Sequence, residues 1–220
     1  MSPRSPSRWR SRWTATWRRR SGARRGSFRT RRRPRTTVGP STSSRASSPP
    51  PRWSRHASYR RLVAIDPRVD IGHVHLKVSD IDRALGFYRD VLGFEETTRY
   101  GDQAVFISAG GYHHHIGLNT WESLGGSPPP PGTTGLYHVA IRYPTRAALA
   151  DALRRVLEAR IPLSGASDHG VSEAIYLHDP DENGIELYWD RPKDQWPREG
   201  GKVTMYTRPL DLEGLLAEAT

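Results

Sequence analysis

Two histidines and one glutamate stand where they could bind a metal ion together. His73 and His138 open two similar apolar stretches, IGHVHL and LYHVAI, and Glu186 lies in a later one, NGIELYWD. A carboxylate that faces a pocket is costly unless it is paired or coordinated. Because the chain has no cysteine, a metal must be held by histidine and carboxylate. Two imidazoles and one carboxylate, with other positions open, suit Fe(II), Mn(II) or another divalent ion.

The first of these stretches begins a pattern of one strand, one helix and three strands. In residues 71–80, aliphatic residues alternate with His73, His75 and Lys77, which predicts a half-buried strand. Apolar residues then recur at helical spacing in SDIDRALGFYRDVLGF, with Ser79 or Asp80 as the N-cap. FEETTRYG, QAVFISAG and HHHIGLNTW are expected to be short strands separated by turns that contain glycine.

The pattern recurs after a linker with four consecutive prolines. GLYHVAIRYP predicts a strand, TRAALADALRRVLEARI a helix capped by Thr145, and SEAIYLHDP and NGIELYWD two strands around a DPDENG turn. The two copies are residues 71–121 and 135–190, with His73 and His138 at the equivalent point. This recurrence favours metal binding over the alternative, in which both histidines bond to the backbone and Glu186 is exposed. A single core is expected over residues 62–192.

The two ends of the chain differ from this core. Residues 1–61 carry 19 Arg and no Lys, Asp or Glu, while the other 15 basic residues against all 23 acidic ones leave residues 62–220 at −8. The Arg-, Ser- and Pro-rich composition predicts a disordered tail. We favour an inert tail or a translation-start artefact over a targeting peptide, or a nucleic-acid or membrane contact through Trp9, Trp13 and Trp17. Residues 193–220 are expected to be an extension with a terminal helix.

Residues 71–192 resemble the vicinal-oxygen-chelate superfamily, which includes glyoxalase I, fosfomycin-resistance proteins and extradiol ring-cleaving dioxygenases. The stretch HVHLKVSDIDRALGFYRDVLGF is similar to the opening module of that superfamily. The resemblance implies an α+β fold in which two βαβββ modules pair into a cupped, barrel-like sheet around a metal site. The metal-ligand positions of the superfamily map onto His73, His138 and Glu186.

The stretch DHGVSEAIYLHDPDENGIE resembles the signature of the extradiol dioxygenases. The positions that match it are His169, Ile175, Tyr176, Asp179, Pro180 and Glu186, while Ser167 and Glu182 depart from the usual residues. The resemblance implies that Tyr176 donates a hydrogen bond to a substrate oxygen and that His169 donates to bound substrate or oxygen. The alternative is that Tyr176 packs across strands and His169 is a loop residue.

Three consecutive histidines, residues 113–115, precede IGLNTW. In the extradiol branch a histidine near this point acts as acid and base, and alignment places that role on His114. Strand alternation instead puts His115 on the face that Glu186 occupies in the second copy, so His115 is the rival and His113 a rim residue. Gly117 stands at the position equivalent to Glu186, so the first copy supplies no carboxylate, unlike the four-ligand arrangement of glyoxalase I.

These observations predict a metal-dependent extradiol dioxygenase of the catechol 2,3-dioxygenase type, acting on a small aromatic diol and O2. Fe(II) is the first choice of metal and Mn(II) the second. The alternatives are a glyoxalase-like lyase or isomerase, a thiol transferase, or a non-catalytic binder of small molecules. No run of 18 apolar residues and no signal-like segment occurs, so a cytoplasmic location without membrane contact is expected. A homodimer is a further expectation, and nucleic acid is not an expected partner of the core.

Overall fold

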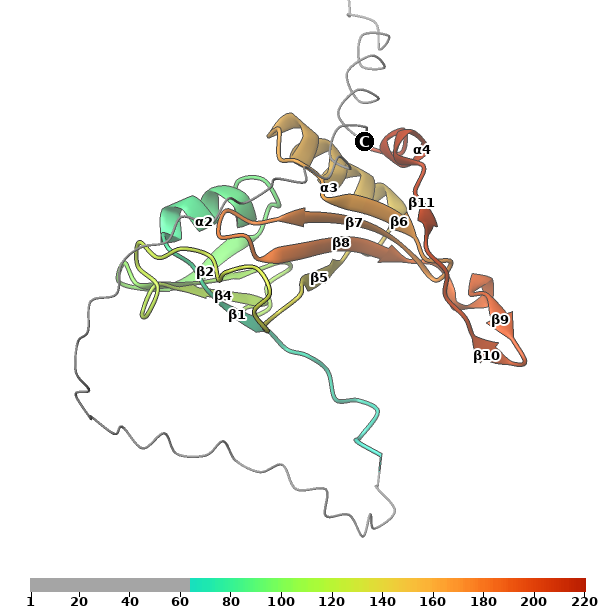
Figure 1. The fold of residues 1–220 in the computed structure, drawn as a ribbon, viewed down its shortest axis with the longest axis horizontal. Helices are drawn as coiled ribbons and strands as arrows, with labels where there is room; N and C mark the ends of the chain where they lie inside the picture. The colour runs from blue at the N-terminus through green and yellow to red at the C-terminus, as the bar shows by residue number, and fades with distance from the viewer. Residues whose placement is uncertain (1–63) are drawn as a thin grey trace, which may run out of the picture. The chain divides into compact units, whose positions relative to one another are not determined.

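Two mixed sheets form the body of the protein (Figure 1). The computed structural model describes residues 64–220, and the tail predicted for residues 1–61 lies outside them. The first sheet has the strand order β1 (Val74–Lys77), β4 (Ile116–Asn119), β3 (Ala104–Ser108), β2 (Glu95–Tyr100). The second has the order β5 (Val139–Arg142), β8 (Gly184–Asp190), β7 (Ser172–His178), β6 (Gly165–Asp168), β11 (Arg208–Pro209).

The two sheets repeat one strand arrangement. The opening strand of each module runs parallel to its last strand, β1 beside β4 and β5 beside β8, whereas the other neighbours are antiparallel. In register, Val74 faces Ile116 and Val139 faces Ile185. The predicted α+β class with two paired βαβββ modules is therefore confirmed. Equivalent positions follow from the register: one histidine directly precedes each opening strand.

One helix in each module covers the sheets from the same side (Figure 1). Helix α2 (Ile81–Tyr88) begins at Asp80, whose carboxylate accepts from the backbone N–H of Arg83 at 2.7 Å. Helix α3 (Arg146–Glu158) begins at Thr145, whose hydroxyl accepts from the N–H of Ala148. Their apolar stripes pack with the sheets into one core, whose largest fully buried side chains include Tyr88, Leu85, Ile107, Leu118, Leu149, Leu153, Ile175, Leu177, Ile185 and Leu187.

The DPDENG turn between β7 and β8 joins the second module to helix α2 of the first. The buried Tyr88 hydroxyl donates to Oδ2 of Asp179 at 2.9 Å, and the backbone N–H groups of Asp181 and Asn183 donate to its Oδ1 at 2.9 Å. Asp181 in turn accepts from the N–H of Ser79 at 3.1 Å. Two buried carboxylates thus link the modules, and their negative charge is compensated by several hydrogen-bond donors.

The extension after residue 192 contains more structure than the sequence predicts. A short 3-10 helix η3 (Lys193–Gln195) leads into the hairpin β9 (Arg198–Glu199) and β10 (Lys202–Val203), and α4 (Leu212–Leu216) follows β11. Leu215 of α4 is fully buried. The residues of strand β6, which completes the second βαβββ module, were not identified from the sequence, because Gly-Ala-Ser-Asp shows no alternation of apolar and polar side chains. In residues 64–220, no helix has the length and apolar character needed to cross a membrane.

Candidate active site

His138 and Glu186 lie against each other at the start of the paired strands β5 and β8. His138 Nε2 is 2.9 Å from Oε2 of Glu186, and both side chains are partly exposed. Gly184 makes this approach feasible, since a Cβ atom there would lie 2.2 Å from the carbonyl oxygen of Tyr137 and 3.2 Å from Cβ of His138. Two of the three predicted metal ligands are therefore neighbours.

A hydrogen-bonded chain leads from Glu186 to His169. The Tyr176 hydroxyl lies 3.2 Å from Oε1 of Glu186 and 2.8 Å from Nε2 of His169. Tyr176 faces Glu186 directly across β7 and β8, as the ten-residue spacing around the turn predicts. On the other side, Nδ1 of His169 is 3.0 Å from the carbonyl oxygen of Tyr206. The second module thus brings four of the predicted site residues, His138, Glu186, Tyr176 and His169, into one network, and the extension adds the carbonyl of Tyr206.

The other two predicted residues, His73 and His114, meet on the first module. Their ring centroids are 4.5 Å apart, and the ring of Phe106 lies 4.9 Å from that of His114. Burial, followed by the neighbouring imidazoles of His113 and His73, lowers the pKa of His114. A lowered pKa favours the neutral ring, which can accept a proton at neutral pH.

His115, the rival of His114, is turned elsewhere. Its Nδ1 lies 3.0 Å from the hydroxyl of Ser108, and its ring packs 4.8 Å from that of Tyr112. Strand β4 begins at Ile116, but the backbone of His115 already bonds on both sides: its N–H donates to the carbonyl of Ile107 at 2.9 Å and its carbonyl accepts from the N–H of Val74 at 3.0 Å. Nδ1 of His113 is 2.7 Å from Nδ1 of His114, and His113 lies on the outer side of the pair, since it is exposed whereas His114 is half-buried.

The donors present fit a divalent ion in part. Two ligands at neighbouring positions around one ion, each at about 2.1 Å, lie about 3.0 Å apart, which is close to the separation of the His138 and Glu186 donors. In the part of the chain that the structure describes, no three His, Cys, Asp or Glu side chains are grouped so that they could hold a metal. His73 is thus not brought together with the other two, and its role as a ligand stays a prediction.

Gly117 shows how the first module differs from the second. It pairs with His75 as Glu186 pairs with Ala140, so the two positions are equivalent. A Cβ atom at Gly117 would lie 2.9 Å from Cδ2 of His75. The imidazole of His75 therefore occupies the space next to the position at which a second carboxylate would stand.

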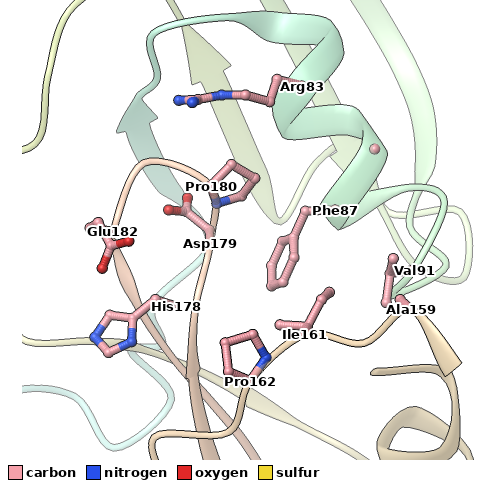
Figure 2. A pocket seen from close by; sticks show the side chains of 11 residues that line it. Arg83, Phe87, Val91, Ala159, Ile161, Pro162, His178, Asp179, Pro180 and Glu182 are labelled. Carbon is pink, nitrogen blue, oxygen red and sulfur yellow. The ribbon is translucent and has the colours of Figure 1, made fainter. Parts of the chain in front are cut away.

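A pocket of about 450 Å³ lies elsewhere, between α2, the segment after α3 and the DPDENG turn (Figure 2). Phe87 and Pro180 face Ile161 and Pro162 across it. It contains none of the predicted ligands or catalytic residues. Its position indicates a gap where the two modules join rather than the site of the chemistry.

Titration of Tyr176 gives a direct test of its surroundings. Burial, followed by the Glu186 carboxylate, raises the pKa of Tyr176 to about 12. We expect Tyr176→Phe to remove, in ultraviolet absorbance titrations of metal-free protein, a phenolate that forms near pH 12. In the parent, folded protein keeps the Tyr176 proton that the unfolded chain releases near pH 10. The contribution of this group to the free energy of unfolding is therefore complete below about pH 10 and is lost as the pH rises towards 12. If Tyr176→Phe instead removed a phenolate that forms near the ordinary tyrosine pKa of about 10, the result would contradict the arrangement.

The comparison with protein families shows which family this chain and its candidate site belong to. The model of the glyoxalase/bleomycin resistance protein/dioxygenase superfamily matches residues 70–187. The chain belongs to this superfamily. The matched residues include both opening strands, the His138–Glu186 pair and the Tyr176–His169 contact, so the site lies within the part that the superfamily shares.

Two curated relatives illustrate the range of similarity. The chain is 40% identical over 160 residues to catechol-2,3-dioxygenase of Bacillus subtilis (strain 168), covering 72% of this chain and 55% of that protein. It is 31% identical over 135 residues to biphenyl-2,3-diol 1,2-dioxygenase 3 of Rhodococcus globerulus, covering 58% of this chain and 66% of that protein. The chain thus spans roughly half to two thirds of the length of these curated relatives.

A solved structure from the same superfamily supports the fold alone. The structure of a glyoxalase/dioxygenase from Nostoc punctiforme matches with a TM-score of 0.51 and 21% identity, covering 61% of this chain and all of that chain.

Proposed function

We propose that this chain is a metal-dependent extradiol dioxygenase that cleaves a catechol-like ring with O2. The observation that carries the proposal is the His138–Glu186 pair at 2.9 Å, joined through Tyr176 to His169. Two relatives whose names give a catechol and a biphenyl diol as substrates support the same assignment. The proposal includes Fe(II), or Mn(II), held by His138, Glu186 and His73, and also a cytoplasmic homodimer.

A divalent ion in this site would supply a Lewis acid that binds the diol and passes electron density between it and O2. The side chains around it have separate tasks. Tyr176 keeps its phenol proton at neutral pH, as a tyrosine of ordinary or raised pKa does, and can donate a hydrogen bond to a substrate oxygen. His169 orients the Tyr176 hydroxyl through the 2.8 Å contact.

His114 is the proposed acid and base. It lies beside His73, and its lowered pKa keeps the imidazole neutral and able to take up a proton at neutral pH. His115 is a weaker choice, because its Nδ1 is already engaged with Ser108. The His75 ring beside Gly117 argues against a glyoxalase I type of site, since it occupies the neighbourhood of the second carboxylate that such a site needs.

The test is a ring-cleavage assay. Protein loaded anaerobically with Fe(II) or with Mn(II) is mixed with a panel of catechols and then with O2. We expect O2 consumption together with a yellow ring-fission product, and neither with metal-free protein. The hemithioacetal of methylglyoxal and glutathione serves as the competing substrate. Turnover of that compound, with no O2 consumption on any catechol, would contradict the proposal in favour of a lyase.

A further inference from the structure

The C-terminal extension lies directly on the residues that carry His169. Strand β11 adds to the edge of the second sheet, with Arg208 opposite Asp168 and Pro209 opposite Ser167. The backbone N–H of Tyr206 donates to the carbonyl oxygen of His169 at 3.2 Å. Figure 1 shows this segment following the outer side of β6 before it reaches α4. The extension is thus hydrogen-bonded to the loop from which His169 projects.

The ring of Tyr206 is closely packed in this position. A Cβ atom at Gly170 would lie 2.6 Å from the Tyr206 ring and 2.7 Å from Pro197, so only glycine leaves room for the ring. The Tyr206 ring also contacts Arg208, whose guanidinium carbon lies 4.2 Å from the ring centroid, a cation–π distance. Packing around the side chain therefore restrains the backbone of residue 206.

The backbone carbonyl of Tyr206 determines which nitrogen of His169 carries a proton. Nδ1 of His169 lies 3.0 Å from that carbonyl oxygen, and a carbonyl oxygen can only accept. The other partner of Nδ1, the Thr207 hydroxyl, lies farther away at 3.4 Å, so the nearer carbonyl favours Nδ1 as the protonated nitrogen. A neutral imidazole has one N–H, so Nε2 is left as an acceptor, 2.8 Å from the Tyr176 hydroxyl.

The Tyr176 hydroxyl then has one hydrogen and two acceptors to choose from. His169 Nε2 lies at 2.8 Å and Glu186 Oε1 at 3.2 Å, so the shorter contact to His169 is the stronger one. While the hydroxyl donates to His169 it is not available to Glu186 Oε1, and it must turn away from His169 to donate to a substrate oxygen. A distant backbone carbonyl thus controls the direction of a hydroxyl that contacts a predicted metal ligand.

We propose that the extension is part of the active site, in which the Tyr206 carbonyl is a positioning group that fixes the Nδ1–H tautomer of His169 and so directs the Tyr176 hydroxyl. The tautomer follows from the contacts alone, whereas its consequence for turnover rests on the proposed function. The pair Tyr206→Ala and Met205→Ala separates the effect of the packed ring from that of shortening a side chain in the same segment, because Met205 is 65% exposed.

The first test reads the tautomer in the full chain without metal. Histidine labelled with ¹⁵N gives distinct ring signals for the two tautomers and the cation, and His169 is assigned by the signals that His169→Gln removes. At neutral pH we expect Nδ1–H in the parent and in Met205→Ala, and a mixture containing Nε2–H in Tyr206→Ala. An Nε2–H or doubly protonated His169 in the parent, or an unchanged tautomer in Tyr206→Ala, would overturn the proposal.

The second test measures turnover after metal loading. We expect Tyr206→Ala to lower kcat about tenfold, the range seen for outer residues that orient metal-site groups, with unchanged metal content and little change in KM for the diol. Met205→Ala should match the parent. An equal loss in both variants would assign the effect to folding and contradict the positioning role. If no variant cleaves any catechol, the proposed function fails while the tautomer result still stands.

Discussion

Glu186→Gln should lose both its divalent metal and its ring-cleaving activity. The amide has the shape of the carboxylate but lacks the negative charge that compensates a divalent ion, and His138 loses its ionic neighbour at 2.9 Å. A metal site contributes several kcal/mol to transition-state stabilisation, so we expect kcat/KM to fall at least about 10³-fold, which corresponds to about 4 kcal/mol. The measurements are metal content after desalting and O2 consumption on the preferred catechol.

Three further variants separate the proposed ligands from each other and from the fold. His138→Ala should behave like Glu186→Gln. His73→Ala tests the third donor, which lies beside His114 rather than in the His138–Glu186 pair. His178→Ala is the control, since His178 is exposed and lines the separate pocket of Figure 2. Full metal content in Glu186→Gln would contradict the site, whereas full metal and turnover in His73→Ala would remove only that residue from it.

Asp179→Ala is expected to destabilise the body more than any substitution on its surface. The carboxylate is 3% exposed and accepts hydrogen bonds from the Tyr88 hydroxyl and from the backbone N–H groups of Asp181 and Asn183. Removing it leaves these donors without their acceptor at the junction of the modules. Since each unsatisfied buried donor costs about 1 kcal/mol or more, the free energy of unfolding should fall by about 3 kcal/mol.

Urea unfolding of metal-free protein measures this loss. Glu182→Ala is the matched control in the same turn, because Glu182 is exposed, and it should stay within about 0.5 kcal/mol of the parent. Tyr88→Phe removes one donor, but Oδ2 of Asp179 keeps its hydrogen bond from the side-chain amide of Asn183 at 2.9 Å, so the cost should be about 1 kcal/mol. A loss below about 1 kcal/mol in Asp179→Ala would mean that water replaces the carboxylate and that the turn does not hold the modules together.

The repeated modules could be predicted because their signals are local. The alternation around His73 and His138 and the helical stripes that end near Tyr88 depend only on neighbours in the chain. Strand β6 escaped prediction, since Gly165–Asp168 becomes a strand only by pairing with β7 and β11. The surroundings of His115 also have no local signal, because its ring contacts Ser108 of the neighbouring strand β3.

The candidate site divides in the same way. Tyr176 and Glu186 lie on adjacent strands of one hairpin, so their contact followed from spacing. Asp179 was part of the recognised signature, but its bond to Tyr88 joins residues 91 positions apart and has no local signal. The carbonyl of Tyr206 is a backbone group, for which residue type carries no information. The position of His73 relative to His138 depends on how the two sheets meet, which spacing within either module does not fix.

The two modules protect their outer strands differently. In the second, β11 covers β6. In the first, β2 is exposed along its whole length, but it carries Glu95, Glu96 and Arg99 and its register shifts between Glu96 and Thr98. Charge and irregularity on an outer strand discourage the edge-to-edge addition that leads to fibrils. The two modules therefore repeat the same strand order but not the same edge strands. Each module can change its own protection against aggregation without a change in the buried core.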